Sequence, residues 1–233
     1  MSRVLPILFN TDMVRAILDG RKTVTRRICK DVNEYVVPDM SFYDAEKRTY
    51  AVHNFADKEH TDQLSTAERT CPICPGDILY VRETWNTYCE GCISKNLENV
   101  LGSTCAHACG ENGNGYYYKA TDKNHVRWHP SIHMPKEAAR IWIKVKDVRV
   151  ERLHEITAED ALQEGAERYI HLDGSLDESG IRTSFIGIWN STIRKSDLDL
   201  YGWDASPWVW VIEFERCEKP EEISRYAKCE FPK

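Results

Sequence analysis

The sequence lacks long hydrophobic runs and an excess of positive charge. No stretch reaches the roughly 20 consecutive apolar residues that a membrane-spanning helix needs. The first ten residues, MSRVLPILFN, contain neither the apolar run nor the small-residue cleavage site of an export signal. The net charge is -6 and the pI is about 5.8, whereas proteins that bind duplex nucleic acid without sequence preference are usually basic. These absences predict a cytoplasmic protein whose contact with any nucleic acid is local.

The chain also lacks an even set of cysteines, since it has nine. An odd count without an export signal argues against disulfides, because a reducing cytosol keeps thiols free to bind a metal. The length of 233 residues, with 42% hydrophobic and 29% charged residues, is typical of one folded domain, or of one domain that carries a large insertion.

The N-terminal residues ILFNTDMVRAILDGRK predict a short strand, an N-cap at Thr11 and an amphipathic helix. Gly20 is predicted to end this helix, because a left-handed turn is cheapest for a residue without a Cβ atom. The residues from Lys22 to Arg27 are therefore expected just beyond a helix terminus.

The rest of the chain alternates between strand and helix patterns. Strands are predicted at ILYVRETW, after a turn at residues 75–77, at RIWIKVKDVRVERL, and at SPWVWVIEFERC. A helix is predicted to begin at a capping-box-like Thr157 and to end at Gly165, with Glu164 in its last turn, and a second helix at TSFIGIWNSTI. Residues 31–67 predict a peripheral β-hairpin, and the four cysteines and five glycines of residues 86–115 indicate an insertion. These patterns give an α+β fold class.

The run from Gly20 to Arg27, GRKTVTRR, fits the pattern G-x-K-x-x-T-x-R. It is followed in order by PGDILYVRETW, the strong central strand, the ITAEDALQEGA helix and a strand ending in VIEFER. This order resembles ASCH domains, a branch of the PUA-like superfamily, of the type encoded by bacteriophages and prophages. The resemblance covers nearly the whole chain except the insertion. It implies a PUA-like mixed β-barrel with a few peripheral helices, as a single domain over residues 1–233 with a Cys/Gly-rich insertion at about 86–115, in a bacterial or phage-infected cell.

The resemblance also implies a site. One small bacterial ASCH protein is an N4-acetylcytidine amidohydrolase with a catalytic lysine, threonine and glutamate, and these correspond to Lys22, Thr25 and Glu164. A lysine with a lowered pKa can take a proton from Thr25 or from water, and Glu164 can position the water or return a proton to the leaving amine. This chemistry requires no cofactor. The chain is about twice as long as that minimal enzyme, so the substrate stays open.

Four further residues are predicted to contact a substrate. Arg27 and Arg26 are candidate forks for phosphate or carboxylate, because a guanidinium group stays charged. Glu83 and Trp85, at the end of the VRETW strand, can bond to a base and stack on it.

Each of these candidates has a structural alternative. Basic residues after a helix often only offset the helix dipole, and a threonine such as Thr25 is common in loops and strands. Glu164 at a helix end is usually solvated, and Glu83 can simply form a salt bridge with an arginine beside a core tryptophan.

The cysteines of the insertion are spaced like metal ligands. Cys89-x-x-Cys92 and Cys105-x-x-x-Cys109 form two pairs separated by twelve residues, a spacing compatible with one structural zinc ion. His107 can replace one of the second pair, and Cys71-x-x-Cys74 offers another half-site. Free thiols in a loop are the alternative.

Three functions follow as hypotheses. The first is an enzyme that hydrolyses an N-acylated nucleoside such as N4-acetylcytidine, and the second is a module that binds RNA without chemistry. The third is a ribonuclease that acts on single-stranded RNA. No pair of metal-binding carboxylates in the sequence supports this third hypothesis. The expected partner is RNA or a modified nucleoside, not a membrane. A buried Lys22 beside Thr25 and a carboxylate favours the enzyme, and a wide basic groove favours the binder.

Overall fold

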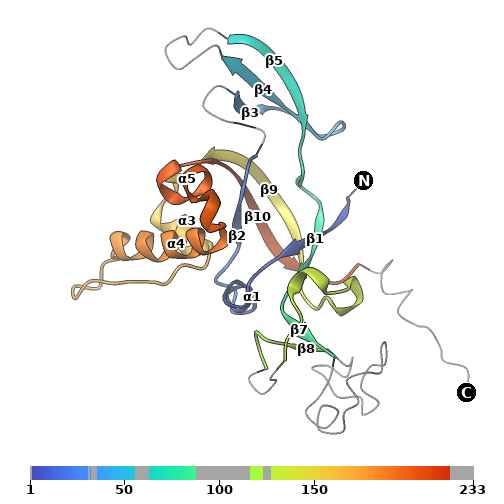
Figure 1. The fold of residues 1–233 in the computed structure, drawn as a ribbon, viewed down its shortest axis with the longest axis vertical. Coiled ribbons are helices and arrows are strands. Elements are labelled where there is room, and N and C mark those ends of the chain that lie inside the picture. Colours follow the sequence, from blue (N-terminus) through green and yellow to red (C-terminus); the bar gives the residue numbers. More distant parts are fainter. Residues whose placement is uncertain are drawn as a thin grey trace, which may run out of the picture. The chain divides into compact units, whose positions relative to one another are not determined.

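The chain forms two compact units, each assembled from segments that are far apart in the sequence. The structure, a computed structural model, describes residues 2–30, 32, 36–55, 63–87, 116–122 and 127–220. Unit 1 takes its residues from 1–19, 77–144 and 216–233, and unit 2 takes them from 20–76 and 145–215. Strands β9 and β10 have residues in both units (Figure 1). The single-domain organisation expected from the sequence stays a prediction.

Unit 1 contains a helix and a small mixed sheet. Strand β1 pairs in parallel with β6, and β6 pairs antiparallel with the first residues of β9. A core cluster of Tyr118, Met134 and Trp142 packs with residues of β1 and β6. The elements that begin in this unit are β1 (Val4–Leu8), α1 (Thr11–Leu18), β6 (Ile78–Arg82), β7 (Trp85–Asn86), β8 (Tyr117–Tyr118), η3 (Ser131–His133), η4 (Lys136–Ala138) and β9 (Trp142–Arg152).

Helix α1 starts one residue earlier than the sequence suggests. The cap is Asn10, whose side chain accepts a hydrogen bond from the backbone N–H of Met13 at 2.9 Å, so the predicted N-cap at Thr11 is wrong. Both residue types cap helices well, which is why the sequence does not separate them. Gly20 has a φ of +74°, the left-handed conformation predicted for the end of the helix.

Unit 2 contains two groups of strands. In the first, β10 pairs antiparallel with β2, and β9 is the other neighbour of β10. In the second, β3, β4 and β5 form an antiparallel sheet. The hairpin expected between residues 31 and 67 corresponds to β3 and β4, but β5 adds a third strand, and Val52 of β4 is fully buried. The strand bounds are β2 (Val24–Ile28), β3 (Val36–Asp44), β4 (Thr49–Phe55), β5 (Gln63–Thr70) and β10 (Trp208–Cys217).

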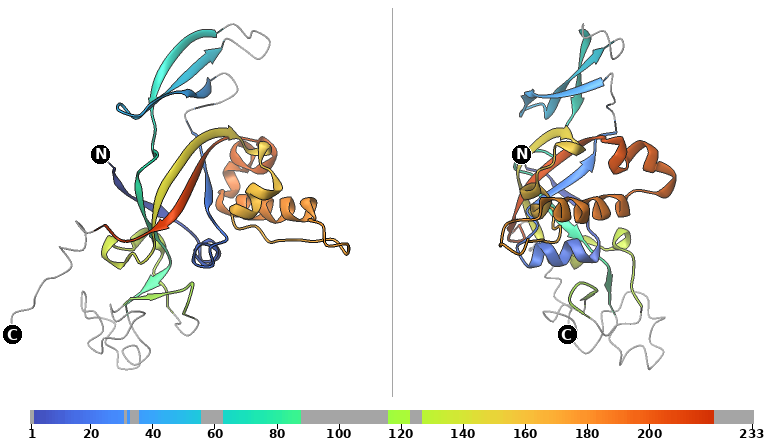
Figure 2. Two further views of the ribbon diagram at one scale, coloured as in Figure 1. Left: turned by 180° about the vertical axis from the view of Figure 1, so that it is seen from behind. Right: turned by 90° about the vertical axis from the view of Figure 1, so that its left-hand side faces the viewer.

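The helices of unit 2 gather beside β2, β9 and β10 (Figures 1 and 2). Their core includes Phe185 and Trp189 of the longest helix, packed with Val24 of β2 and with Val209 and Val211 of β10. Burying a large apolar side chain of this kind stabilises the folded state by about 1.5–3 kcal/mol per residue. The elements are η5 (Leu153–Glu155), α3 (Ala158–Gln163), α4 (Glu178–Thr192), η6 (Lys195–Asp197), α5 (Leu198–Tyr201) and η7 (Trp203–Ala205).

The ends of α3 follow the local signals of the sequence. The Thr157 side chain accepts a hydrogen bond from the backbone N–H of Asp160 at 3.1 Å, and Gly165 has a φ of +95°. Glu164 is the residue between the last helical residue, Gln163, and this glycine. Helix α4 begins before the predicted segment, because the side chain of Asp177 accepts a bond from the backbone N–H of Gly180 and serves as its cap.

The α+β class is confirmed by this arrangement. Within the part of the chain that the structure describes, the strands of each unit form open sheets and do not close into a barrel. Among the same residues, no helix has both the length and the apolar character needed to cross a membrane.

Candidate functional site

Lys22 lies two residues before the start of β2 and is buried, with 3% of its surface exposed. Its ammonium group donates hydrogen bonds to the backbone oxygens of Val24 at 2.7 Å and Glu164 at 2.8 Å, and to Oε2 of Glu164 at 2.6 Å. An ammonium group has three donors, so these acceptors use all of them. The backbone around this contact is held by a bond from the N–H of Thr23 to the oxygen of Gln163. The structure therefore joins two of the predicted catalytic residues in one buried pair.

The environment of Lys22 lowers its pKa. Burial is the largest cause, because a low-dielectric surrounding disfavours the charged form. The charge of Glu164 and its hydrogen bond act in the opposite direction and raise the pKa, whereas the positive charges of Arg27 and Arg26 lower it further. The result is a lysine that gives up its proton more readily than an exposed lysine does.

Arg26 lies on the helix side of β2 and is enclosed by carboxylates. Its side chain is completely buried and donates to Glu151, to Asp160 Oδ2 at 3.3 Å and to Glu164 Oε1 at 3.4 Å. Glu164 is therefore shared: Lys22 binds one of its oxygens and Arg26 faces the other. Arg149 extends the network from Glu151, at 3.2 Å, to Glu213, a strand neighbour of β2. Arg26 was expected to contact substrate, and here it holds the carboxylates in place.

Thr25 and Arg27 lie on the other face of β2. Adjacent residues of a strand point to opposite faces, and directly opposed residues of an antiparallel pair point to the same face. Thr25 is opposite Ile212 of β10, and Arg27 is opposite Trp210. These four side chains therefore share one face, while Val24 and Arg26 face the helices.

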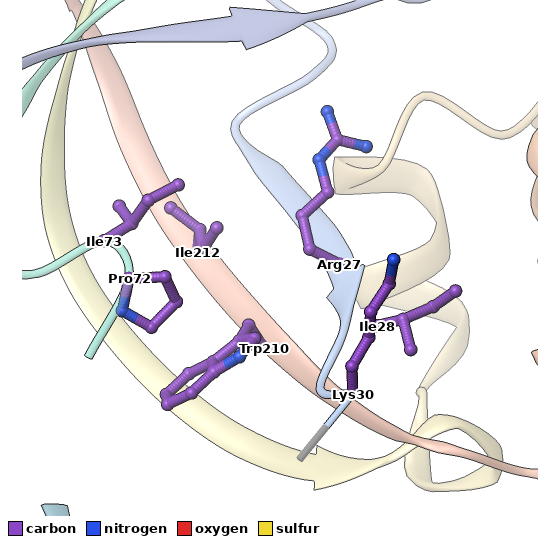
Figure 3. Close-up of a pocket in the computed structure, with 7 residues that line it drawn as sticks. All are labelled: Arg27, Ile28, Lys30, Pro72, Ile73, Trp210 and Ile212. Atoms are coloured by element: carbon purple, nitrogen blue, oxygen red, sulfur yellow. The ribbon is translucent and has the colours of Figure 1, made fainter. Parts of the chain in front are cut away.

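A cavity of about 280 Å³ opens on this face of β2 (Figure 3). Two cations line it, Arg27 and Lys30, together with apolar side chains from three segments of unit 2. Tyr50 packs edge-on against Trp210 at a centroid distance of 5.0 Å. The lining residues are Arg27, Ile28, Lys30, Pro72, Ile73, Trp210 and Ile212.

Arg27 connects the cavity with the buried pair. It lines the cavity, and its charge lowers the pKa of Lys22. The pKa of Arg27 itself is lowered by burial and raised by the charge of Glu164, but a guanidinium group remains protonated at any ordinary pH. A fixed positive charge therefore stands within electrostatic reach of both Lys22 and Glu164.

Thr25 is buried, with 2% exposure, one position from Arg26 and two from Arg27. The hydrogen bonds found among the described residues include none from its hydroxyl group. Its oxygen is not among the buried side-chain atoms that lack a partner, and the strand pairing places Thr25 on the cavity face of β2.

Glu83 and Trp85 belong to unit 1. Glu83 is 1% exposed, and its two carboxylate oxygens accept bonds from Nε and Nη2 of Arg140 at 2.9 and 3.0 Å. This is the salt bridge given above as the structural alternative. The ring of Trp85 lies against Tyr116 and His129. Glu83 and Arg140 therefore form a bidentate salt bridge, and the guanidinium group of Arg140 also lies over the ring of Tyr118 at 3.9 Å.

The predicted zinc ligands Cys89, Cys92, Cys105 and Cys109 lie outside the described residues, as does His107. Within the described ranges, no cluster of three or more His, Cys, Asp or Glu side chains has the geometry to hold a metal ion. Cys71 and Cys74 are both fully buried, and burial together with the neighbouring Cys74 raises the pKa of the Cys71 thiol well above its usual range. A thiol in this state is a poor nucleophile.

Comparisons with protein-family models, with curated proteins and with solved structures gave no match for this chain. The assignment of the site therefore depends on the motif residues and on the geometry described above.

Several residues of the site were not anticipated. Glu151 and Asp160, which hold Arg26, sit in a predicted strand and a predicted helix, but charged residues in such patterns are usually solvated. Lys30 and Trp210, which line the cavity, carried no distinguishing signal either, since a tryptophan in an alternating strand is usually there for packing. Alternation along β2 and β10 shows which of these residues share a face of the sheet, but only once the pairing of the two strands is known.

Proposed function

We propose that this chain is an ASCH-type amidohydrolase that removes the acyl group from an N-acylated nucleoside such as N4-acetylcytidine. The observation that carries the proposal is the buried Lys22–Glu164 pair, with 2.6 Å between Nζ and Oε2 and with a lowered pKa for the lysine. Ionisable groups with a shifted pKa occur more often at functional sites than elsewhere. The PUA-like barrel implied by the GRKTVTRR motif belongs to the same proposal.

The buried pair suits a reaction that needs a proton to be taken up and returned. A nucleophile, either water or the Thr25 hydroxyl, adds to the acyl carbon and gives its proton to the Lys22–Glu164 pair. The pair then returns a proton to the exocyclic nitrogen as the C–N bond breaks. Hydrolysis of N4-acetylcytidine consumes one water and yields cytidine and acetate; where Thr25 is the nucleophile, this water cleaves the acyl ester formed on Thr25. General acid–base assistance of this kind contributes roughly 10²–10⁴-fold to a rate.

Arg27 has a separate role in the proposed reaction. Its positive charge helps to lower the pKa of Lys22, so that the lysine gives up a proton more readily. Arg27 lines the cavity and interacts electrostatically with Glu164 and Lys22. Its guanidinium donates without exchanging a proton, which leaves proton transfer to the buried pair.

The test is release of acetate and cytidine from N4-acetylcytidine, together with a panel of other acylated nucleosides. Wild type, Lys22→Ala, Thr25→Ala and the control Lys144→Ala are compared; Lys144 is an exposed lysine of β9. We expect Lys22→Ala and Thr25→Ala to abolish turnover and the control to keep it. If wild type turns over no member of the panel, the amidohydrolase proposal is wrong, and binding of RNA without chemistry replaces it.

The same assay identifies the nucleophile. If Thr25 attacks the acyl carbon, a rapidly quenched reaction contains protein that carries one additional acyl group at Thr25, visible by mass spectrometry. If water attacks, no acylated protein accumulates.

A further inference from the structure

The cavity beside β2 has two unlike sides (Figure 3). Arg27 and Lys30 extend from β2 and the residues that follow it, and the opposite side is formed by Pro72, Ile73, Trp210 and Ile212. No aspartate or glutamate is among the lining residues. The local charge is therefore positive, although the whole chain carries a net charge of -6. A ligand that fits this distribution is apolar at one end and anionic at the other.

The size of the cavity limits the ligand. Small-molecule pockets have volumes of roughly 300–1,000 Å³, and this cavity, at about 280 Å³, is at the lower limit. It is suited to one nucleotide unit and not to a folded RNA or a peptide. The two cations also differ in a useful way, because arginine offers a planar pair of donors that matches a phosphate, and lysine adds a point charge.

We propose that this cavity binds the phosphate group of the substrate, so that the preferred substrate is a nucleoside monophosphate with an acylated base, and not the free nucleoside. Arg27 and Lys30 hold the phosphate, and the apolar side contacts the base and sugar. Arg27 also interacts electrostatically with the Lys22–Glu164 pair, so the cavity and the pair are electrostatically coupled. The statement about acylated substrates rests on the proposed function, whereas the preference for a phosphate is a property of the cavity.

Binding is measured by calorimetry, with cytidine 5′-monophosphate and cytidine as probes that are not hydrolysed. Wild type is expected to bind the monophosphate at least about tenfold more tightly than cytidine, because charge-assisted hydrogen bonds to a phosphate are stronger than neutral ones. Lys30→Gln and Arg27→Gln should each lose most of this preference and leave the affinity for cytidine nearly unchanged. Lys144→Gln is the control, because it removes an exposed charge of β9 that does not line the cavity.

Lys30 is exposed, so its variant is expected to fold even if the Arg27 variant does not. Equal affinity for the two probes overturns the inference, as does a Lys30→Gln variant that binds the monophosphate like wild type. Tight binding of a single-stranded oligonucleotide without binding of the monophosphate also overturns it, because the cations would then contact an RNA backbone.

The two proposals fail in different ways. A protein that binds the monophosphate through Arg27 and Lys30 but hydrolyses no acylated substrate disproves the amidohydrolase and keeps the phosphate site. A protein that hydrolyses N4-acetylcytidine and its 5′-monophosphate with equal kcat/KM, before and after Lys30→Gln, keeps the enzyme and disproves the phosphate site.

Discussion

Two glutamates are buried among the residues that the structure describes, one in each unit, and they are held in different ways. Glu83 follows β6 and is 1% exposed, and Glu164 follows α3 and is 4% exposed. Both oxygens of Glu83 accept from a single guanidinium group, that of Arg140. The oxygens of Glu164 are divided between Lys22 and Arg26. Glu83 therefore has one bidentate partner, whereas Glu164 has two different cations as partners.

The difference concerns which partner can lose a proton. A guanidinium group remains charged throughout the accessible pH range, so the partner of Glu83 is a fixed charge. The ammonium group of Lys22 has a lowered pKa and can titrate. A buried carboxylate alone therefore does not indicate a catalytic site. The identity of its partner distinguishes a structural ion pair from a pair that is able to transfer a proton.

The largest effect on stability is expected from Arg140→Ala. This change removes the partner of both oxygens of Glu83, and breaking a buried ion pair costs about 3–5 kcal/mol. Urea unfolding of the variant measures the loss, with Arg216→Ala, an exposed arginine at the end of β10, as the control. A loss below about 1 kcal/mol would show that Glu83 does not depend on Arg140.

A smaller loss is expected from Lys22→Met. Oε1 of Glu164 still faces Arg26 in this variant, so the carboxylate keeps a cation, and the cost is about 1–3 kcal/mol for the contacts that are lost. Unfolding in urea gives the value. If Lys22→Met destabilises the protein as much as Arg140→Ala, Arg26 does not stabilise the Glu164 carboxylate. The two glutamates would then not differ in how they are held.

The third prediction concerns pH. Between the lowered pKa of Lys22 in the folded protein and about 10.4 in the unfolded chain, the unfolded state binds more protons. Stability therefore gains a contribution that rises with pH, at no more than about 1.4 kcal/mol per pH unit. Lys22→Met should lack this contribution, and Arg140→Ala should keep it. Equal pH dependence of wild type and Lys22→Met would contradict the shift.

Glu164→Gln sharpens the same experiment. The carboxylate raises the pKa of Lys22 through its charge and its hydrogen bond, so its removal should lower that pKa further. The pH range over which stability rises then begins at a lower pH than in wild type. Glu83→Gln is the matched control, and it should leave that range unchanged.

The smallest effect on stability is expected from Thr25→Val. The two side chains have nearly the same shape, and the hydroxyl of Thr25 makes no hydrogen bond to another described residue. The free energy of unfolding should change by less than about 1 kcal/mol, while turnover of the acylated nucleoside is lost. A large loss of stability would reveal a structural role for the hydroxyl.

Much of the fold was predictable because its signals are local. Gly20 and Gly165 end helices in the left-handed conformation, Thr157 caps α3, and the long apolar alternation of residues 141–152 becomes β9. The faces of β9 were less predictable. Trp142 alternates with Ile141 and Ile143, and all three are buried, so alternation does not separate a buried face from a solvated face at the start of this strand.

The site was predictable only in part, for a related reason. The motif located Lys22 and Thr25, and the order of elements led to Glu164, but no local pattern states that the ammonium group meets the carboxylate. Nor does the sequence reveal that Arg26 is occupied by Glu151 and Asp160, since the burial of charged residues is decided by tertiary packing. No strand was predicted for residues 24–28, so the sequence did not place Arg26 and Arg27 on opposite faces, and the pairing of β2 with β10 was needed to do so.

The contact between Lys22 and Glu164 spans 142 positions of the chain. Contacts between residues so distant in sequence require a large loop to close, and they are expected to form late during folding. An intermediate with β2 and α3 already formed, but not docked, would leave Lys22 in water with an ordinary pKa. The titration of this one lysine, followed during refolding, would therefore report the moment at which the two segments of unit 2 assemble.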